Sequence, residues 1–249
     1  MKILKFFSAK RIIFSFLGTI ILGLSGCFER GDNVMSYDLI PAIVGYSYQT
    51  FQPTLKTPGG TFLAPELQNN LFVDLMEGDA ILTSFYINYN EETLSEYFTA
   101  YNVLYTKVDK GWPQTTFEGE STGNYDVPIE SMSIYGGVEY LWFFVFRHTA
   151  NYDQSFAYEM TYDEYSTDEI PTVYIRAKKY GQQGSATTST FDYPYAFDMK
   201  YFIETHKDAN NRIKFKIKYK TGVDDDGNDK YSDYIDSQFG GEIIDFQIE

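Results

Sequence analysis

Residues 212–220 read RIKFKIKYK, a stretch in which cationic and apolar side chains alternate without a break. A period of two is typical of a β-strand, because successive side chains of a strand point to opposite faces of its sheet. One face of this strand is therefore expected to pack on a core, while the other carries five cations. If further segments repeat the pattern, the fold is all-β.

Strand patterns recur along the rest of the chain. Residues 81–89 alternate in the same way, and residues 138–146 are almost wholly apolar, as in a strand that is buried on both faces. Gly136 and Gly137 precede the second segment and predict a hairpin turn. Further strands are expected at residues 39–48, 98–108, 173–179, 196–204 and 242–248. With 23 Tyr, 21 Phe and little helical periodicity, the chain is expected to be all-β.

Residues 111–126 interrupt the strand patterns. They carry three glycines and one proline among polar residues, which is typical of a linker. We therefore expect two β domains, one at residues 37–110 and the other at residues 127–249, each large enough to have its own core.

The N-terminus has the organisation of a bacterial lipoprotein signal. Four cations in the first 11 residues precede an uncharged stretch, residues 12–26, which is shorter than the about 20 apolar residues of a membrane-spanning helix. This stretch ends Leu-Ser-Gly before Cys27, which resembles a lipobox, and Cys27 is the only cysteine of the chain. We predict a signal peptide over residues 1–26, lipidation of Cys27 and a tether over residues 27–36.

The charge balance excludes some partners. The whole chain has 20 Lys and Arg against 35 Asp and Glu, and loss of the four signal cations leaves 16 against 35, a formal charge of −19. Such a surface repels phosphate backbones and anionic lipids, so no nucleic acid is expected as a partner. The membrane is expected to be reached through the lipid anchor. We expect a location in the bacterial cell envelope, on the outer membrane, with both the periplasmic and the exterior face left open.

Motifs for catalysis, cofactors or metals do not stand out in the sequence. The chain has two histidines, His148 and His206, and neither lies in a motif typical of a Ser-His-Asp triad. With one lipidated cysteine, they cannot complete a Cys/His zinc site. We interpret both as ordinary residues at strand ends, and we predict no catalytic residue, no cofactor and no metal ligand.

The acidic stretch Asp224–Asp229 has two interpretations. Clustered carboxylates on a glycine turn suit calcium, but Gly227 stands at the fourth position, whereas an EF-hand loop requires glycine at the sixth. Asp-Gly after a strand is also a strong turn signal. We predict a hairpin turn, and calcium binding by this loop stays open.

Two surface patterns suit a partner but also have structural explanations, which we favour. The first is the lysine ladder, defined as Arg212, Lys214, Lys216, Lys218 and Lys220. It could bind an anionic glycan, protect an edge strand or pair with carboxylates of a neighbouring strand. The second pattern is a set of aromatic residues near the tether: Tyr37, Tyr46, Tyr48 and Phe51. These rings could form a face that binds a sugar or a protein, or they could pack in the core.

Several short patterns occur in a fixed order along the chain. They are residues 57–65 (TPGGTFLAP), 77–87 (EGDAILTSFYI), 101–107 (YNVLYTK), 127–129 with 137–141, 173–177 (VYIRA) and 213–221. In this order and spacing, the chain resembles the NigD-like lipoproteins of gut and oral Gram-negative bacteria. The resemblance implies an N-terminal small barrel of OB type followed by a C-terminal immunoglobulin-like β-sandwich. It implies no activity, because members of the family are essentially uncharacterised and their name comes from a bacteriocin gene cluster.

These observations favour a non-catalytic envelope lipoprotein that binds a protein or a glycan. One alternative is an envelope glycan hydrolase that uses paired carboxylates, although no pair stands out among the 35 acids. A second alternative, which follows from the family name alone, is a bacteriocin-associated immunity or accessory lipoprotein.

Overall fold

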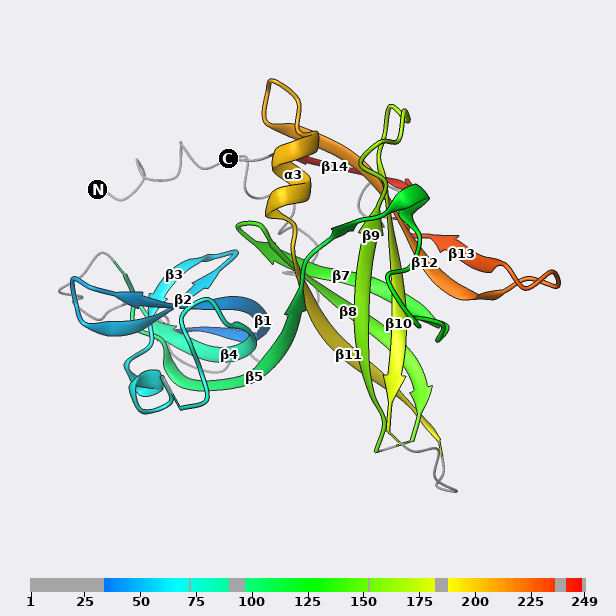
Figure 1. The fold of residues 1–249 in the computed structure, drawn as a ribbon. Coiled ribbons are helices and arrows are strands. Elements are labelled where there is room, and N and C mark those ends of the chain that lie inside the picture. Colours follow the sequence, from blue (N-terminus) through cyan, green and yellow to red (C-terminus); the bar gives the residue numbers. More distant parts are fainter. Residues whose placement is uncertain are drawn as a thin grey trace. The chain divides into compact units, whose positions relative to one another are not determined.

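The computed structural model describes residues 34–71, 73–89, 97–151, 153–181, 188–235 and 241–247 (Figure 1). The chain divides into two compact units, the first comprising Met1–Lys107 with Gly136–Val138 and the second Val108–Tyr135 with Glu139–Glu249. Strands make up most of both, so the all-β prediction is confirmed. Within these ranges, no helix combines the length and apolar character that crossing a membrane requires. The predicted signal peptide and Cys27 lie outside the described residues.

The first unit is built on one curled sheet. Its elements are β1 (Val34–Ser47), β2 (Gln52–Thr57), β3 (Gly60–Leu63), the 3-10 helix η1 (Pro65–Asn69), β4 (Ala80–Asn88) and most of β5 (Tyr101–Gly111). The strands follow the order β3-β2-β1-β4-β5. A parallel bridge joins Leu63, at the end of β3, to Thr99, just before β5, so the two ends of this order meet.

Alternating side chains give the first unit its core. In β4, Ile81, Thr83, Phe85 and Ile87 are buried, as the sequence pattern predicts. They pack with apolar residues of β1, β2 and η1. Residues 34–36, which were expected in the tether, instead begin β1, because they pair with residues 86–88 of β4.

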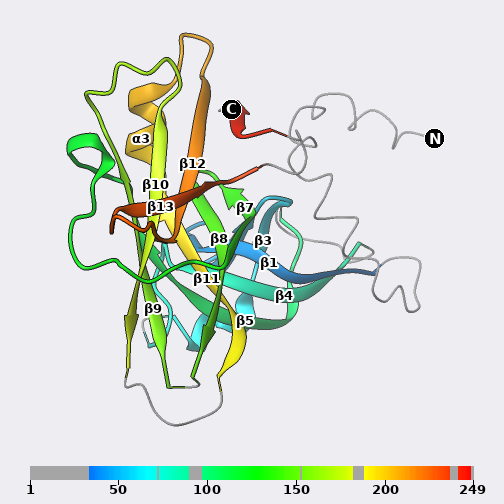
Figure 2. The same cartoon turned by 90° about the vertical axis from the view of Figure 1, so that its right-hand side faces the viewer.

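The second unit has two layers of strands. Its elements are β6 (Gln114–Thr115), the 3-10 helix η2 (Phe117–Gly119), β7 (Ser131–Val138), β8 (Leu141–Ala150), β9 (Ser155–Tyr162), β10 (Thr172–Tyr180), β11 (Ser189–Asp198), α3 (Lys200–His206), β12 (Arg212–Val223), β13 (Asp229–Asp233) and β14 (Ile243–Gln247). One layer has the order β11-β8-β7, with the end of β5 beside β11. The other has the order β13-β12-β10-β9-β6, and β14 also pairs with β12. Figure 2 shows β9, β10 and β12 running along one layer.

Aromatic side chains fill the space between the two layers. Trp142, Phe144 and Phe146 of β8 are at most 2% exposed, and Trp142 contacts Phe215 of β12 at 5.4 Å between ring centroids. Burial of such rings is the largest favourable contribution that this sequence offers to folding. The apolar face of residues 212–220 lies in this core, as its alternation predicts.

Two local predictions were wrong. Gly136 and Gly137 lie within β7, and the hairpin turn comes later, where Glu139 takes a φ of +55°. The strand expected at residues 196–204 ends at Asp198 and is followed by α3. Met199, Phe202 and Ile203 are fully buried, and their spacing of three and four residues is that of one helix face, which outweighed the short strand pattern.

Candidate functional site

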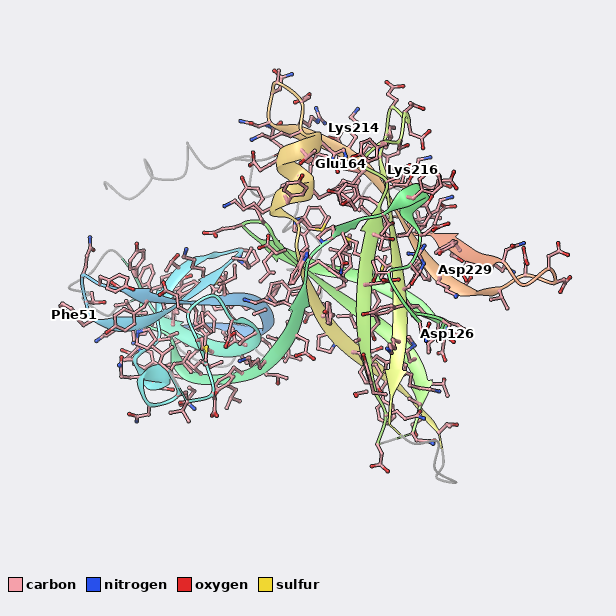
Figure 3. The ribbon with its side chains drawn as sticks, in the orientation of Figure 1. Phe51, Asp126, Glu164, Lys214, Lys216 and Asp229 are labelled. Atoms are coloured by element: carbon pink, nitrogen blue, oxygen red, sulfur yellow. The ribbon has the colours of Figure 1, made fainter. Side chains whose placement is uncertain are left out.

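The lysine ladder forms a row of ion pairs on the outer face of the layer that contains β12. Every cation lies within 4.0 Å of a carboxylate. The ion pairs are Arg212–Asp245, Lys214–Asp245, Lys216–Glu242, Lys218–Asp233 and Lys220–Asp229. These acids come from β13, β14 and the residue before β14. Figure 3 labels Lys214 and Lys216 of β12 and Asp229 of β13. Because β12 has neighbours on both sides, its cations do not protect an edge, and pairing with adjacent carboxylates explains them.

At one end of the ladder, the cations of the ion pairs become buried, while their acid, Asp229, is exposed. Lys220 is 4% exposed, and its Nζ lies 2.5 Å from Oδ1 of Asp229. Arg176 of β10, also 4% exposed, places Nε 3.6 Å from the other oxygen of Asp229. Burial of unpaired charge is costly, so this end of the sheet is stable only as a complete set of partners.

The guanidinium of Arg176 is held in one orientation by three hydrogen bonds. Nε donates to the Tyr231 hydroxyl at 2.6 Å, Nη1 donates to Thr161 Oγ1 at 2.7 Å, and Nη2 donates to the Gly119 carbonyl at 2.7 Å. Thr161 in turn donates to the same carbonyl at 2.7 Å. The partners come from three different parts of the chain, so the arginine joins β9, β13 and the η2 segment.

Glu159 of β9 attaches the segment that was expected to be a linker. Its carboxylate is 2% exposed and accepts hydrogen bonds from the Ser121 hydroxyl at 2.5 Å and from the backbone N–H and hydroxyl of Thr122 at 3.0 and 2.7 Å. Oε1 also lies 3.8 Å from Nη1 of Arg176. Residues 111–126 thus contain β6 and η2 and belong to the second unit, because a buried carboxylate needs the donors that they supply.

The η2 segment has a strained backbone. Glu118 takes a φ of +50° and Gly119 a φ of +72°, both in the left-handed region. A Cβ on Gly119 would lie 2.5 Å from Cδ2 of Tyr174, so glycine is required both by the backbone and by this close approach. Such strain persists where surrounding contacts impose it, and it often marks binding sites.

A pocket of about 450 Å³ opens between the η2 segment and the outer face of the sheet. We call it the η2 pocket. It is lined by Glu118, Glu120, Ser121, Tyr174, Arg176, Lys218, Asp229 and Tyr231. The rings of Tyr174 and Tyr231 meet edge to face at 5.3 Å, and the Arg176 guanidinium lies 5.6 and 5.2 Å from their centroids. The pocket therefore combines aromatic walls, a fixed cation and several carboxylates.

Protonation at neutral pH follows from these contacts. Burial raises the pKa of Tyr231 to about 12, so its phenol stays neutral. Burial alone would raise the pKa of Asp229, but hydrogen bonds from Lys220 and Tyr231 and the charges of Lys220 and Arg176 outweigh it and lower the pKa. The pocket thus presents an ionised carboxylate that is already paired.

Neither histidine lines the pocket. His148 lies inside β8, 2% exposed, and stacks on Phe156 at 4.0 Å between centroids, and burial lowers its pKa to about 4. His206 is the last residue of α3 rather than the end of a strand, and its Nδ1 lies 2.8 Å from the Phe202 carbonyl.

The acidic stretch from Asp224 forms the β12–β13 hairpin turn, as predicted. The Asp224 carboxylate accepts hydrogen bonds from the backbone N–H groups of Asp226 and Asn228 at 3.0 and 2.8 Å. Gly227 takes a φ of +86°. In the described part of the chain, three or more His, Cys, Asp or Glu side chains do not come together as a candidate metal site.

The four aromatics near the tether do not form one face. Tyr37 packs in the core of the first unit, 4.8 Å from Phe85 and 5.3 Å from Phe62 between centroids. Tyr48 and Phe51 lie at the turn between β1 and β2, each 71% exposed. Tyr46 is half-buried against the same core and meets Tyr48 edge to face at 5.3 Å, and the Tyr48 hydroxyl donates to Glu77 at 3.5 Å. Core packing therefore explains Tyr37 and Tyr46, whereas Phe51 is exposed at the turn.

The sequence did not single out Arg176, Glu159 or Tyr231. Arg176 did stand out in one respect, as a cation on the polar side of an otherwise apolar strand, residues 173–177. Glu159 alternates with tyrosine, methionine and threonine residues, and no pattern showed that donors 37 and 38 residues away would cover it.

Solved structures share this fold. No family model and no curated protein matches the chain. An uncharacterised protein from Parabacteroides merdae is similar with a TM-score of 0.64 and 16% identity, over 86% of this chain and 99% of that one. A candidate lipoprotein from Bacteroides fragilis gives a TM-score of 0.52 and 12% identity, over 87% and 98%.

A NigD-like immunity protein from Bacteroides caccae is also similar, with a TM-score of 0.51 and 14% identity, over 89% of this chain and all of that one. The chain thus has an all-β fold that also occurs in proteins of Parabacteroides and Bacteroides. The predicted resemblance to the NigD-like lipoproteins is confirmed at the level of the fold.

Proposed function

We propose that this chain is a NigD-like lipoprotein of the cell envelope that binds a neutral glycan in the η2 pocket and does not turn it over. One observation carries the proposal: two tyrosine rings flank a guanidinium that three hydrogen bonds hold fixed in a pocket of about 450 Å³. Ligand pockets typically have this size and a few polar groups whose positions are fixed beforehand.

The mixture of charges in the η2 pocket favours a neutral polyhydroxylated ligand. Three carboxylates and two cations line it. An anionic ligand would be repelled by Glu118, Glu120 and Asp229, and an ammonium group would be repelled by Arg176 and Lys218. A sugar hydroxyl both donates and accepts hydrogen bonds, so it matches both kinds of group, and the apolar faces of a sugar ring match tyrosine.

Pairing of the charged groups favours binding over hydrolysis. A glycosidase needs two carboxyl groups, one of them with a raised pKa that lets it donate a proton. Among the described carboxylates whose pKa is clearly shifted, every shift is downward: Asp192, Glu204, Asp208, Asp224 and Asp229.

The topology of the first unit supports an OB-type barrel. Its five strands follow the order β3-β2-β1-β4-β5, a parallel bridge connects the ends of that order, and a short helix lies between the third and fourth strands. For the second unit, two layers around one aromatic core support an immunoglobulin-like sandwich.

Anchoring through Cys27 is part of the same proposal. The support is the lipobox-like Leu-Ser-Gly-Cys sequence together with the similar fold of a candidate lipoprotein. A diacyl or triacyl anchor holds a protein durably at a membrane, and we propose the outer membrane.

A role in bacteriocin immunity is the second candidate, and it is favoured by the NigD-like immunity protein among the similar structures. Expression of the chain in a sensitive strain should then protect against a bacteriocin encoded beside its gene. Absence of protection in that strain removes this candidate.

Calorimetry with the mature protein tests the glycan proposal. After a screen of neutral and anionic oligosaccharides, we expect a neutral one to bind, and Tyr174→Ala to weaken it at least tenfold. Tyr165→Ala is the matched control, because Tyr165 is 86% exposed and lies outside the pocket, so its affinity should be unchanged. Tyr231→Phe keeps the ring and tests the hydroxyl. Binding of anionic glycans alone, equal affinity in all variants, or release of free sugar would overturn the proposal.

A further inference from the structure

An exposed apolar patch lies on the first unit near the start of β1. We call it the β1 patch, and its members are Met35, Tyr89 and Phe98, which are 44, 48 and 36% exposed. The Tyr89 hydroxyl lies 3.0 Å from the sulfur of Met35, and the rings of Tyr89 and Phe98 meet edge to face at 5.2 Å. Met35 pairs with Ile87 of β4, two residues before Tyr89, so Met35 and Tyr89 project from the same face of the sheet.

The length of chain before this patch limits where it lies. Only residues 28–34 separate Cys27 from Met35. Even a fully extended chain of eight residue steps spans at most about 29 Å. If Cys27 carries the lipid, as the proposed function requires, the β1 patch stays within that distance of the bilayer surface.

The chemistry of the patch suits the interface of a bilayer. Its described members are uncharged, although the mature protein has a formal charge of −19. A strongly acidic surface is repelled by anionic headgroups, so an uncharged face approaches a membrane most easily. Tyrosine places an apolar ring among acyl chains and its hydroxyl among headgroups.

We propose that the β1 patch rests on the lipid bilayer beside the anchor, so that the first unit lies against the membrane. The patch is too small to hold the protein on a membrane by itself. The anchor removes this difficulty, because a tether of a few residues converts binding of the patch into an intramolecular step at high effective concentration.

Fluorescent labels on the lipidated full-length protein test the position of the patch. Because the thiol of Cys27 is blocked by lipid, an introduced cysteine is the only reactive thiol of the chain. One variant is Tyr89→Cys, in the patch. The matched control is Ser36→Cys, which is also exposed and follows Met35, but points to the opposite side of β1. Both labels lie close to Val34, where the tether joins β1: position 36 is two residues after Val34, and position 89 follows Asn88, which pairs with Val34. The two positions therefore differ mainly in the face of the sheet from which they project.

Each variant is placed in vesicles of phosphatidylethanolamine and phosphatidylglycerol that contain a fraction of nitroxide-labelled lipid. We expect the label at position 89 to be quenched at least threefold more by nitroxide than the label at position 36, and to be shielded from aqueous iodide. Equal quenching at both positions in protein that floats with the vesicles overturns the β1 patch. Protein that does not float at all overturns the anchor itself, which is a separate result.

A charged variant gives an independent test. Met35→Asp replaces an exposed side chain, so the melting temperature should be unchanged while quenching at position 89 falls to the level seen at position 36. Quenching that persists in a folded Met35→Asp protein overturns the proposal.

Discussion

The two units differ in what they bury. Among the described residues, the buried polar side chains of the first unit are the threonines Thr54, Thr57 and Thr83. The second unit buries charged and titratable side chains, namely Glu159, Arg176, Lys220 and His148. Threonine costs little to bury because one hydrogen bond satisfies it, whereas each charged group needs a full set of partners.

This difference supports the proposal that the binding site lies in the second unit. Replacing a buried ion pair with apolar residues is often neutral or stabilising, so stability alone does not explain why the second unit retains one. The walls of the η2 pocket are held by the buried pair of Glu159 and Arg176 together with Asp229, which is exposed. Exposed apolar side chains do not distinguish the units, because both carry them, for example Phe51 in the first and Phe117 in the second.

Substitution of Glu159 should produce the largest difference between the units. Glu159→Gln removes the carboxylate that accepts hydrogen bonds from Ser121 and Thr122 and leaves Arg176 with Asp229 as its remaining acid. Breaking a buried pair typically costs about 3–5 kcal/mol, and we expect a loss of about 3 kcal/mol in the free energy of unfolding.

Tryptophan fluorescence during urea unfolding measures this loss selectively. Both tryptophans, Trp112 and Trp142, belong to the second unit, so their signal follows that unit, while circular dichroism follows both. The control is Asp192→Asn, which breaks an exposed pair with Arg147 and should change the midpoint little. Equal midpoints for the two variants would show that the buried pair is not what stabilises the η2 segment.

Acid should destabilise the second unit through His148. Burial holds the pKa of its imidazole at about 4, against an ordinary value of 6.5, so the unfolded chain binds the proton more tightly than the folded protein. Stability is therefore full above pH 6.5 and falls as the pH drops from 6.5 toward 4. The slope is about 1.4 kcal/mol per pH unit, for a total of about 3 kcal/mol.

Measuring stability against pH in the wild-type protein and in a His148 variant tests whether His148 causes the loss of stability in acid. We expect His148→Phe, which keeps a ring against Phe156, to flatten the fluorescence-detected profile between pH 4 and 6.5. An unchanged slope in this variant would assign the acid sensitivity to other groups.

The fold could be predicted largely because alternation is a local signal. The cationic and apolar faces of residues 212–220 specified β12, and the same period specified β4. Alternation could not specify α3, because seven residues between two strands give a helix too few turns to show its period. It also gave no reason to place the 111–126 segment against β9, where Glu159 holds it.

The candidate site could not be predicted because its partners are distant in sequence. Arg176 contacts Gly119 and Tyr231, which are 57 and 55 residues away. Each of the three residues has an ordinary local pattern. The pairing of β10 with β12 and of β12 with β13 brings Tyr231 to Arg176. The pairing of β9 with β10 and with β6 brings Gly119 to it. The lysine ladder was visible in the sequence, but no local pattern indicated which acids would pair with it; they lie at positions 229, 233, 242 and 245.

Substitution of Gly119 should have an intermediate effect that is confined to the second unit. Gly119→Ala places a Cβ 2.5 Å from the Tyr174 ring on a residue with a φ of +72°. Left-handed backbone alone costs an L residue about 1–2 kcal/mol, and displacement of Tyr174 adds to it. Gly227→Ala is the control, because Gly227 has a φ of +86° but open space around it. Equal losses of fluorescence-detected stability in the two variants would show that the contact with Tyr174 adds nothing.

The smallest effect is expected from a buried polar group of the first unit. Thr83→Val keeps the shape of the side chain and removes one hydrogen bond, donated by Oγ1 to the Leu104 carbonyl at 2.8 Å. A single neutral hydrogen bond contributes about 1 kcal/mol, so circular dichroism should detect a loss of that size while tryptophan fluorescence detects none. If Thr83→Val destabilised the protein as strongly as Glu159→Gln, the two units would not differ in the cost of their buried polar groups. The buried charges beside the η2 pocket would then be explained by stability, as buried polar groups are elsewhere in the chain. Their burial would no longer support a role in binding.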